Sequence, residues 1–177
     1  LITKHHQVKN TENLVVNGQV RLFNQIARTM PEVLSEQRLT VNGRCERAVE
    51  LASGHDVSVY WCNRNEEGNL IAKIDPDARQ ISGSMDIEKK EALLLDFANG
   101  NIKRLITKPK ITAFGLNWQH CAHTVFFPTF SYEQYYQAIR RFWRFGQVRP
   151  VTCDLVYSDG QQRVMDSLLA KTQKASE

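Results

Sequence analysis

The segment Gln137–Gln147, QAIRRFWRFGQ, carries the residues of this sequence that are best suited to phosphate chemistry. Gln137, Arg141 and Arg144 are separated by four and then three residues, so a helix would project all three from one face. A guanidinium is planar and permanently charged, which suits it to a phosphate whose negative charge grows during transfer. Gly146 would end this helix and leave the arginines near an exposed terminus. The spacing therefore predicts a pair of arginines that clamp a phosphate.

A basic, aromatic helix on a solvated surface is the alternative interpretation of this segment, because charged helix faces are usually just solvated. The pattern Gln-x-x-x-Arg-x-x-Arg-x-Gly-Gln nevertheless fixes five positions. At roughly 5% for each residue type, its chance occurrence in a chain of this length is on the order of one in ten thousand. The complete pattern favours the phosphate clamp.

Short apolar runs bounded by turn residues predict the strands that position this segment. Such runs cover residues 57–62, 79–82, 102–107, 124–128 and 151–157. Helices are predicted near residues 66–73, 85–100, 131–145 and 159–175. Strands that alternate with helices imply βαβ units, so we expect an α/β fold with a mostly parallel central sheet and helices on both faces. Ligands of such sheets lie beyond the carboxyl ends of the strands, where the loops follow Cys62, Ser82, Thr107 and Pro128.

The first fifty residues are less regular. Two helices are predicted, in GQVRLFNQIARTM and NGRCERAVELA, with turn residues between them. We expect residues 1–50 to form a helical connector from a preceding domain and residues 51–177 to form the domain itself. The start at Leu1 favours a piece of a longer protein, and His5 and His6 are interpreted as tail residues.

Composition limits the class of protein. The chain has 177 residues, of which 42% are hydrophobic and 24% charged, as in an ordinary globular domain. No apolar run long enough for a membrane span and no secretory signal occur, so we expect a cytoplasmic protein without a membrane partner. The four cysteines are scattered and predict reduced, mostly buried thiols. A net charge of +4 suits a polyanionic partner such as nucleic acid, but does not establish one.

The QAIRRFWRFGQ segment resembles motif VI of superfamily-two helicases, and in particular the Swi/Snf-like branch. That resemblance implies a RecA-like three-layer α/β/α fold in which Arg141 and Arg144 are fingers on the γ-phosphate of ATP, with Gln137 positioning them or the nucleotide. Arg140 and Trp143 depart from the branch, where an acidic residue and a histidine are common. The resemblance covers about residues 56–157.

A second segment, Thr107 followed by AFGLNWQ at residues 113–119, resembles motif V. A glycine in a loop after a parallel strand lets backbone amides approach a phosphate closely. The resemblance implies that Thr107 and Lys108 contact a nucleic-acid backbone and that Gly115, Asn117 and Gln147 face the nucleotide. The inserted KPK resembles helicases of phage or prophage origin. A helix start with Trp118 in the core is the alternative interpretation of GLNWQ.

Two further segments resemble other parts of the same lobe. VSVYWCNRNEEGNL is similar to motif IV, and ISGSMDIEKKEALLLDFANGNIKRLIT to the strand, turn and helix that follow it. The resemblance implies contacts to the tracked strand from Asn63, Arg64, Gly83 and Ser84. We therefore expect DNA, or RNA, as a partner.

The chain lacks the other half of a motor. No glycine is followed by lysine and no Asp-Glu pair occurs, so a P-loop and an acidic magnesium motif are absent from the sequence. ATP with Mg²⁺ would be bound mainly by a first RecA-like lobe of the same parent chain, and we expect this lobe alone to be inactive. A nucleic-acid-binding module that kept the fold but lost the motor is the alternative.

Competing sites are weaker. His120, Cys121 and His123 are crowded on one short segment without a fourth ligand, so we expect no metal site and no cysteine nucleophile there. Asp75 and Asp77 flank Pro76 and are interpreted as turn residues.

Overall fold

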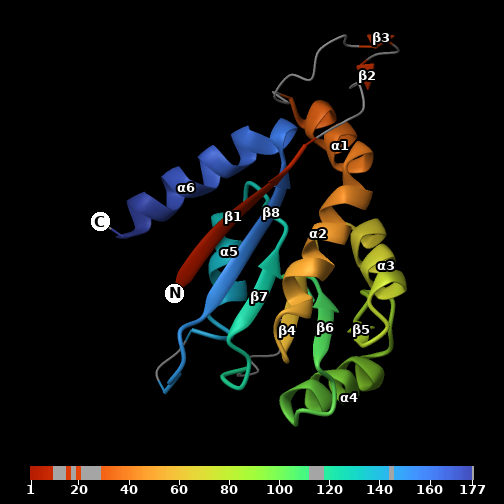
Figure 1. Cartoon of the computed structure of the whole chain (residues 1–177), viewed down its shortest axis with the longest axis vertical. Coiled ribbons are helices and arrows are strands. Elements are labelled where there is room, and N and C mark those ends of the chain that lie inside the picture. Colours follow the sequence, from red (N-terminus) through yellow and green to blue (C-terminus); the bar gives the residue numbers. More distant parts are fainter. Residues whose placement is uncertain (10–14, 17–18, 21–28, 112–117, 144–145, 177) are drawn as a thin grey trace.

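The computed structural model describes residues 1–9, 15–16, 19–20, 29–111, 118–143 and 146–176 (Figure 1). Its strands are β1 (Ile2–Val8), β2 (Val15–Val16), β3 (Gln19–Val20), β4 (Ser58–Trp61), β5 (Ala78–Gln80), β6 (Arg104–Thr107), β7 (His123–Phe126) and β8 (Thr152–Ser158). Its helices are α1 (Met30–Leu39), α2 (Val41–Ser53), α3 (Asn65–Ile74), α4 (Ile87–Ala98), α5 (Tyr132–Ile139), the 3₁₀ turn η1 (Asp159–Gln161) and α6 (Gln162–Ser176).

Six strands form one sheet in the order β1-β8-β7-β4-β6-β5, and every pair in it is parallel. β2 and β3 form a separate antiparallel pair. All six strands of the sheet therefore end at the same edge, which we name the carboxyl edge, and begin at the opposite one, the amino edge. The carboxyl edge lies towards the top of Figure 1, near α1.

Alternating side chains of the strands pack into two separate hydrophobic cores. Val59 and Trp61 of β4 belong to the core shared with α4, α5 and α6. Tyr60, which points the other way, belongs to the core shared with α2 and α3. Successive residues of a strand face opposite sides of a sheet, so these two cores are the two faces, and the fold has three layers. The predicted α/β/α architecture with a parallel central sheet is confirmed.

Most of the predicted elements occur at their predicted places, from β4 in VSVYWC to α6 near the end of the chain. α4 ends as expected, with Asn99 as its C-cap and Gly100 in the left-handed region at φ 81°. Ser131 caps α5 by accepting a hydrogen bond from the backbone of Gln134 at 3.3 Å.

The expectation of a purely helical segment before residue 51 is wrong for its first residues. Ile2–Val8 is an edge strand of the main sheet, paired with β8 along its whole length. The segment NGRCERAVELA is α2, as predicted, and α2 packs on the sheet through Cys45, Ala48 and Ala52. Most of the other predicted helix, GQVRLFNQIARTM, lies outside the described residues. The interpretation of His5 and His6 as tail residues is therefore also wrong.

All four cysteines are buried and free, as their scattering predicted. Burial raises the pKa of the Cys45 thiol to about 12, so this thiol is protonated at neutral pH and a poor nucleophile. Among the described residues, no helix is both long and apolar enough to cross a bilayer.

Candidate functional site

Three loops at the carboxyl edge carry the residues that the sequence predicts to contact a nucleic-acid backbone. The loop after β4 supplies Asn63 and Arg64, and the loop after β5 supplies Gly83 and Ser84. β6 ends at Thr107, and Lys108 follows it. β4, β5 and β6 are consecutive neighbours in the sheet. The structure therefore brings all six predicted residues to one edge.

A polar cavity of about 650 Å³ lies at this edge. Gly83, Ser84 and Lys108 of the predicted set line it. Sequence reasoning missed several further lining residues, which are Asn65, Asn69, Gln80, Ser82, Met85, Lys110 and Ile111. Most of them lie within a few residues of the predicted ones, so the position of the loops after parallel strands was the available signal.

The cavity is electropositive on one side. Lys108 donates a hydrogen bond to Asn65 at 2.5 Å, and Asn65 begins α3. The positive end of the α3 dipole thus lies beside the Lys108 ammonium. Lys90 of α4 donates to the carbonyl of Gly83, a residue that also lines the cavity, at 3.0 Å. Two ammonium groups and a helix amino terminus suit this edge to an anionic backbone.

Thr107 does not line the cavity, because its side chain is only 1% exposed. Its Oγ1 atom makes no hydrogen bond with the described residues. Asn63 lies in a neighbouring, more apolar pocket between α1 and α5, beside Gln37 and Ser131. The predicted contacts thus divide into residues that face the polar cavity and residues behind or beside it.

The buried Glu67 side chain fixes the loop after β4 by hydrogen bonds to its backbone. One carboxylate oxygen of Glu67 accepts hydrogen bonds from the backbone amides of Asn63 at 2.9 Å and Arg64 at 2.8 Å. The other oxygen forms a buried ion pair with Arg44 of α2. The Arg64 guanidinium pairs with Glu66 at 3.0 Å.

The helix that carries the predicted phosphate clamp is shorter than expected. α5 ends at Ile139, and the chain continues in tight turns in which Arg141 N–H donates to the carbonyl of Ala138 and Phe142 N–H to that of Ile139. Phe142 is thereby fully buried in the core. The expectation that a single helix carries Gln137 and both arginines to Gly146 is wrong.

The three residues predicted to form the phosphate clamp differ in their environments. Gln137 is exposed on α5 and donates to Glu133 at 3.2 Å. Arg141 is half-buried in the turn that follows. Arg144 lies outside the described residues, as do Gly115 and Asn117 of the predicted nucleotide set.

The segments that resemble motifs V and VI nevertheless meet. Trp118 N–H donates to the carbonyl of Arg141 at 2.9 Å. The side-chain amide of Gln147 donates to the carbonyls of Gln119 and Phe142, each at 3.0 Å. Gly146, at φ 94°, lies against Gln119, where a Cβ atom would come within 3.2 Å of its amide. Gln147 thus fastens the two segments together.

This meeting point is away from the carboxyl edge. Gln147 is also 3.5 Å from the carbonyl of Cys121, and the carbonyl of Ala122 accepts a hydrogen bond from Thr152. Ala122 and Thr152 stand where β7 and β8 begin. The segment around Gln147 is therefore near the amino edge, and the structure does not gather all of the predicted functional residues at one edge.

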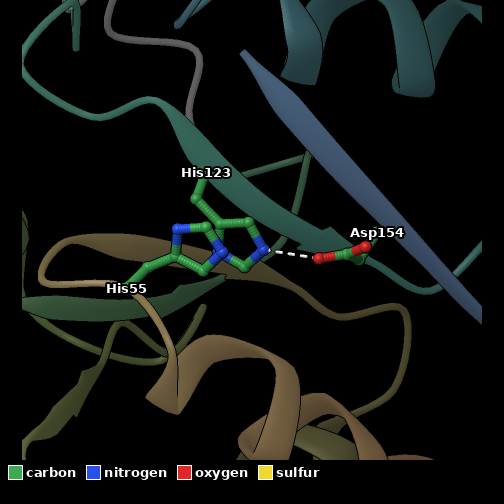
Figure 2. Close-up of side chains that lie close together, drawn as sticks. All are labelled: His55, His123 and Asp154. Carbon is green, nitrogen blue, oxygen red and sulfur yellow. Dashed lines mark hydrogen bonds and ion pairs between the residues drawn. The ribbon is translucent and has the colours of Figure 1, made fainter. Parts of the chain in front are cut away.

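A second cluster of polar side chains lies at the amino edge, where His55, His123 and Asp154 converge (Figure 2). His123 begins β7, Asp154 lies in β8, and His55 follows α2. His123 Nε2 is 2.6 Å from Asp154 Oδ2, and the ring of His55 lies flat on that of His123 with centroids 3.7 Å apart. His6 of β1 reaches the other carboxylate oxygen at 2.7 Å.

The electrostatics of this cluster favour an ionised carboxylate. Burial alone would raise the pKa of Asp154, but its hydrogen bonds with His123 and His6 outweigh that effect and hold the pKa below its ordinary value. Burial, and then the charge of His123, lower the pKa of His55. At neutral pH the Asp154 carboxylate is therefore ionised and the His55 ring is neutral.

His120, Cys121 and His123, at which the sequence predicts no metal site, do not together form this cluster. The Cys121 thiol donates to the carbonyl of His123 at 3.1 Å, and His120 packs edge-on against Phe97. Of the crowded trio, His123 alone belongs to the cluster. Its partners come from distant parts of the chain, so sequence spacing gave no signal for them.

Comparison with known proteins defines the class. Residues 41–146 match the helicase conserved C-terminal domain family, and the chain belongs to that family. No curated protein matches the chain. The family consists of helicase motor lobes, and the three-layer fold described above is the fold of this class.

Solved structures of an ATPase domain and of a DEAD-box protein share the fold. The C-terminal part of the Fun30 ATPase domain is 14% identical with a TM-score of 0.57, and the match covers 80% of this chain and 48% of that one. The C-terminal domain of the DEAD-box protein Dbp5 is 18% identical with a TM-score of 0.61, over 74% and 79% of the two chains. Dbp5 of S. cerevisiae bound to RNA and ADP BeF3 is 18% identical with a TM-score of 0.62, over 73% and 36%. The chain thus spans about half the length of the Fun30 fragment.

Proposed function

We propose that this chain is the second motor lobe of an ATP-dependent DNA helicase or translocase. The observation that carries the proposal is the joining of the two segments that resemble motifs V and VI, through Trp118, Arg141 and Gln147, in a chain of the helicase C-terminal family. Because of the pattern QAIRRFWRFGQ, we further propose that the motor belongs to the Swi/Snf-like branch and is of phage or prophage type.

The nucleotide side of the proposed motor is formed by the joined segments. Arg141 and Arg144 would act as fingers on the γ-phosphate of ATP with Mg²⁺, which a first lobe of the parent chain would bind. Gln137 would position them. Gly115 and Asn117 would face the nucleotide. Gln147 would face it through its backbone, because its side-chain amide binds the carbonyls of Gln119 and Phe142.

The nucleic-acid side is the carboxyl edge. Lys108 and the amino terminus of α3 supply positive charge to the polar cavity, and Gly83 and Ser84 also line it. Hydroxyls, backbone amides and ammonium groups are the groups that proteins use to contact phosphates without reading sequence. Asn63, Arg64 and Thr107 would complete this track, with Arg64 leaving Glu66 to reach a phosphate.

Binding of DNA and turnover of ATP by the parent protein test this proposal together. We expect single-stranded or duplex DNA to stimulate its ATPase activity, and Arg141→Ala to abolish turnover while sparing ATP binding. The isolated lobe should show no meaningful turnover, because the phosphate-cradling loop is absent from its sequence.

A stand-alone nucleic-acid-binding module would behave differently. DNA binding by the lobe, combined with no ATP-binding lobe in the parent chain, would favour that module and overturn the motor. Stimulation by RNA alone would overturn the choice of DNA and leave the motor standing.

A further inference from the structure

The cluster at the amino edge has the composition of a metal site. His55, His123 and Asp154 each offer one ligand atom, and these atoms lie within 4.8 Å of one another. Two imidazoles and a carboxylate form a nitrogen and oxygen set of the kind that zinc and similar divalent ions accept. We propose that these three side chains bind one divalent metal ion, such as zinc.

Contacts outside the three ligands support this assignment. His123 Nδ1 is 2.7 Å from Ser58 Oγ, inside the protein. When the hydroxyl accepts the Nδ1 proton, the lone pair of Nε2 points at the site, which is how metal-bound histidines are usually oriented. On the other side, His6 holds the second oxygen of Asp154 at 2.7 Å and leaves Oδ2 directed at His123.

Binding requires a small rearrangement. Nε2 of His123 and Oδ2 of Asp154 are 2.6 Å apart, whereas two ligands of a tetrahedral zinc ion stand roughly 3.3–3.5 Å apart at bond lengths of about 2.1 Å. The metal would take the place of the proton between these atoms, and the His123 ring would then carry its proton on Nδ1, donated to Ser58 Oγ, instead of on Nε2. The exposed His55 ring would turn out of its stack on His123 to direct a nitrogen at the ion.

The surroundings leave room for this movement. His55 and His123 line an open cavity of about 300 Å³ together with Asp56, Val57, His120 and Arg149. Figure 2 shows the two rings stacked on one another, with His123 directed at Asp154. The cavity gives the ion a path of entry and leaves a position for water as a fourth ligand.

The bound ion would cross-link separate elements of the lobe. His55 belongs to the turn after α2, whereas His123 and Asp154 belong to neighbouring strands of the sheet. An ion bound to all three would fasten that turn to the amino edge. Because the unfolded chain does not hold these residues together, metal binding would stabilise the folded lobe.

Titration of the full 177-residue chain with zinc chloride after removal of metals with EDTA tests the proposal. We expect one equivalent to bind and the melting temperature to rise by several degrees. Cobalt(II) should give visible d–d absorption of a low-symmetry nitrogen and oxygen site. No retained metal and no change in melting temperature would overturn the proposal.

Three variants locate the site. His55→Ala should remove one ligand from an exposed position without disturbing the core and should abolish the rise in melting temperature. Ser58→Ala should weaken binding by roughly 10–100-fold. His5→Ala is the matched control, because His5 is exposed on β1 with its ring edge against Tyr157 and offers no ligand to the cluster. Equal loss in His5→Ala and His55→Ala, or loss in neither, would contradict the assignment.

Discussion

Glu67 and Arg44 form an ion pair in which both side chains are only 1% exposed. Arg44 also donates to the carbonyl of Gln37 at 2.7 Å and to the hydroxyl of Thr40 at 3.0 Å. The Glu67 oxygen that does not pair with Arg44 accepts hydrogen bonds from the backbone amides of Asn63 and Arg64. This pair thus connects α1 and α2 to a loop of the proposed nucleic-acid track.

Replacing Glu67 with alanine should destabilise the lobe strongly. The change leaves the Arg44 charge buried without its partner and two loop amides without an acceptor, and breaking a buried pair in this way costs about 3–5 kcal/mol. Urea unfolding measures the loss.

Glu66→Ala is the matched control for that measurement. Glu66 is the neighbouring residue, and its pair with Arg64 is exposed. Its loss should change the unfolding midpoint little. Similar midpoints for the two variants would show that the buried pair does not hold the loop.

Replacing Lys108 with alanine should weaken binding of DNA to the lobe about equally for all sequences. One phosphate contact is lost, so the slope of log binding constant against log salt should fall by about one unit. Fluorescence anisotropy at several salt concentrations measures both effects.

Lys73→Ala is its control, because Lys73 is exposed near the end of α3, at the opposite edge of the sheet. If the salt slope did not change in Lys108→Ala, or if it changed equally in Lys73→Ala, the cavity would not be part of the nucleic-acid binding surface.

The Asp75 carboxylate should make stability depend on pH in the acid range. It accepts hydrogen bonds from Arg104 at 2.5 and 3.0 Å and from Tyr60 at 2.8 Å. Burial alone would raise its pKa, but these bonds outweigh burial and hold the pKa below its ordinary value. A depressed pKa contributes stability that is present above the unfolded pKa of about 3.9 and is lost as pH falls through the folded value.

We therefore expect Asp75→Asn to be less stable than the unchanged protein at pH 7, with a difference that narrows below about pH 4. Urea unfolding at a series of pH values measures the difference. Asp77→Asn provides a comparison, since Asp77 also contacts Arg104, at 3.0 Å, but its side chain is 67% exposed. A difference between Asp75→Asn and the unchanged protein that stayed constant down to pH 2.5 would contradict the role of Asp75.

The sequence predicted the central elements because their signals are local. β4 is a mostly apolar run because it is buried on both faces, and α4 ends at the Asn99-Gly100 pair. β1 gave no such signal. It is a polar edge strand, largely exposed, and backbone hydrogen bonds to β8 place it in the sheet.

The candidate sites were predictable in part for the same reason. Loops after parallel strands meet at one edge whatever their sequence, so the grouping of Gly83 and Lys108 could be expected. The early end of α5 could not, because it depends on Phe142 turning into a core beside Trp61 and Trp118. The pairing of His6 with Asp154 joins residues 148 positions apart, and no local pattern carries such information.

ATP turnover by the Arg141→Ala variant of the parent protein tests the central claim most directly. Arg140→Ala is the matched control, since Arg140 precedes Arg141 and lies over the ring of Tyr136 at 5.5 Å. We predict that Arg141→Ala lowers DNA-stimulated turnover by about 10³-fold or more with ATP binding retained, and that Arg140→Ala lowers it little. Turnover that survived the loss of Arg141 would contradict its assignment as an arginine finger.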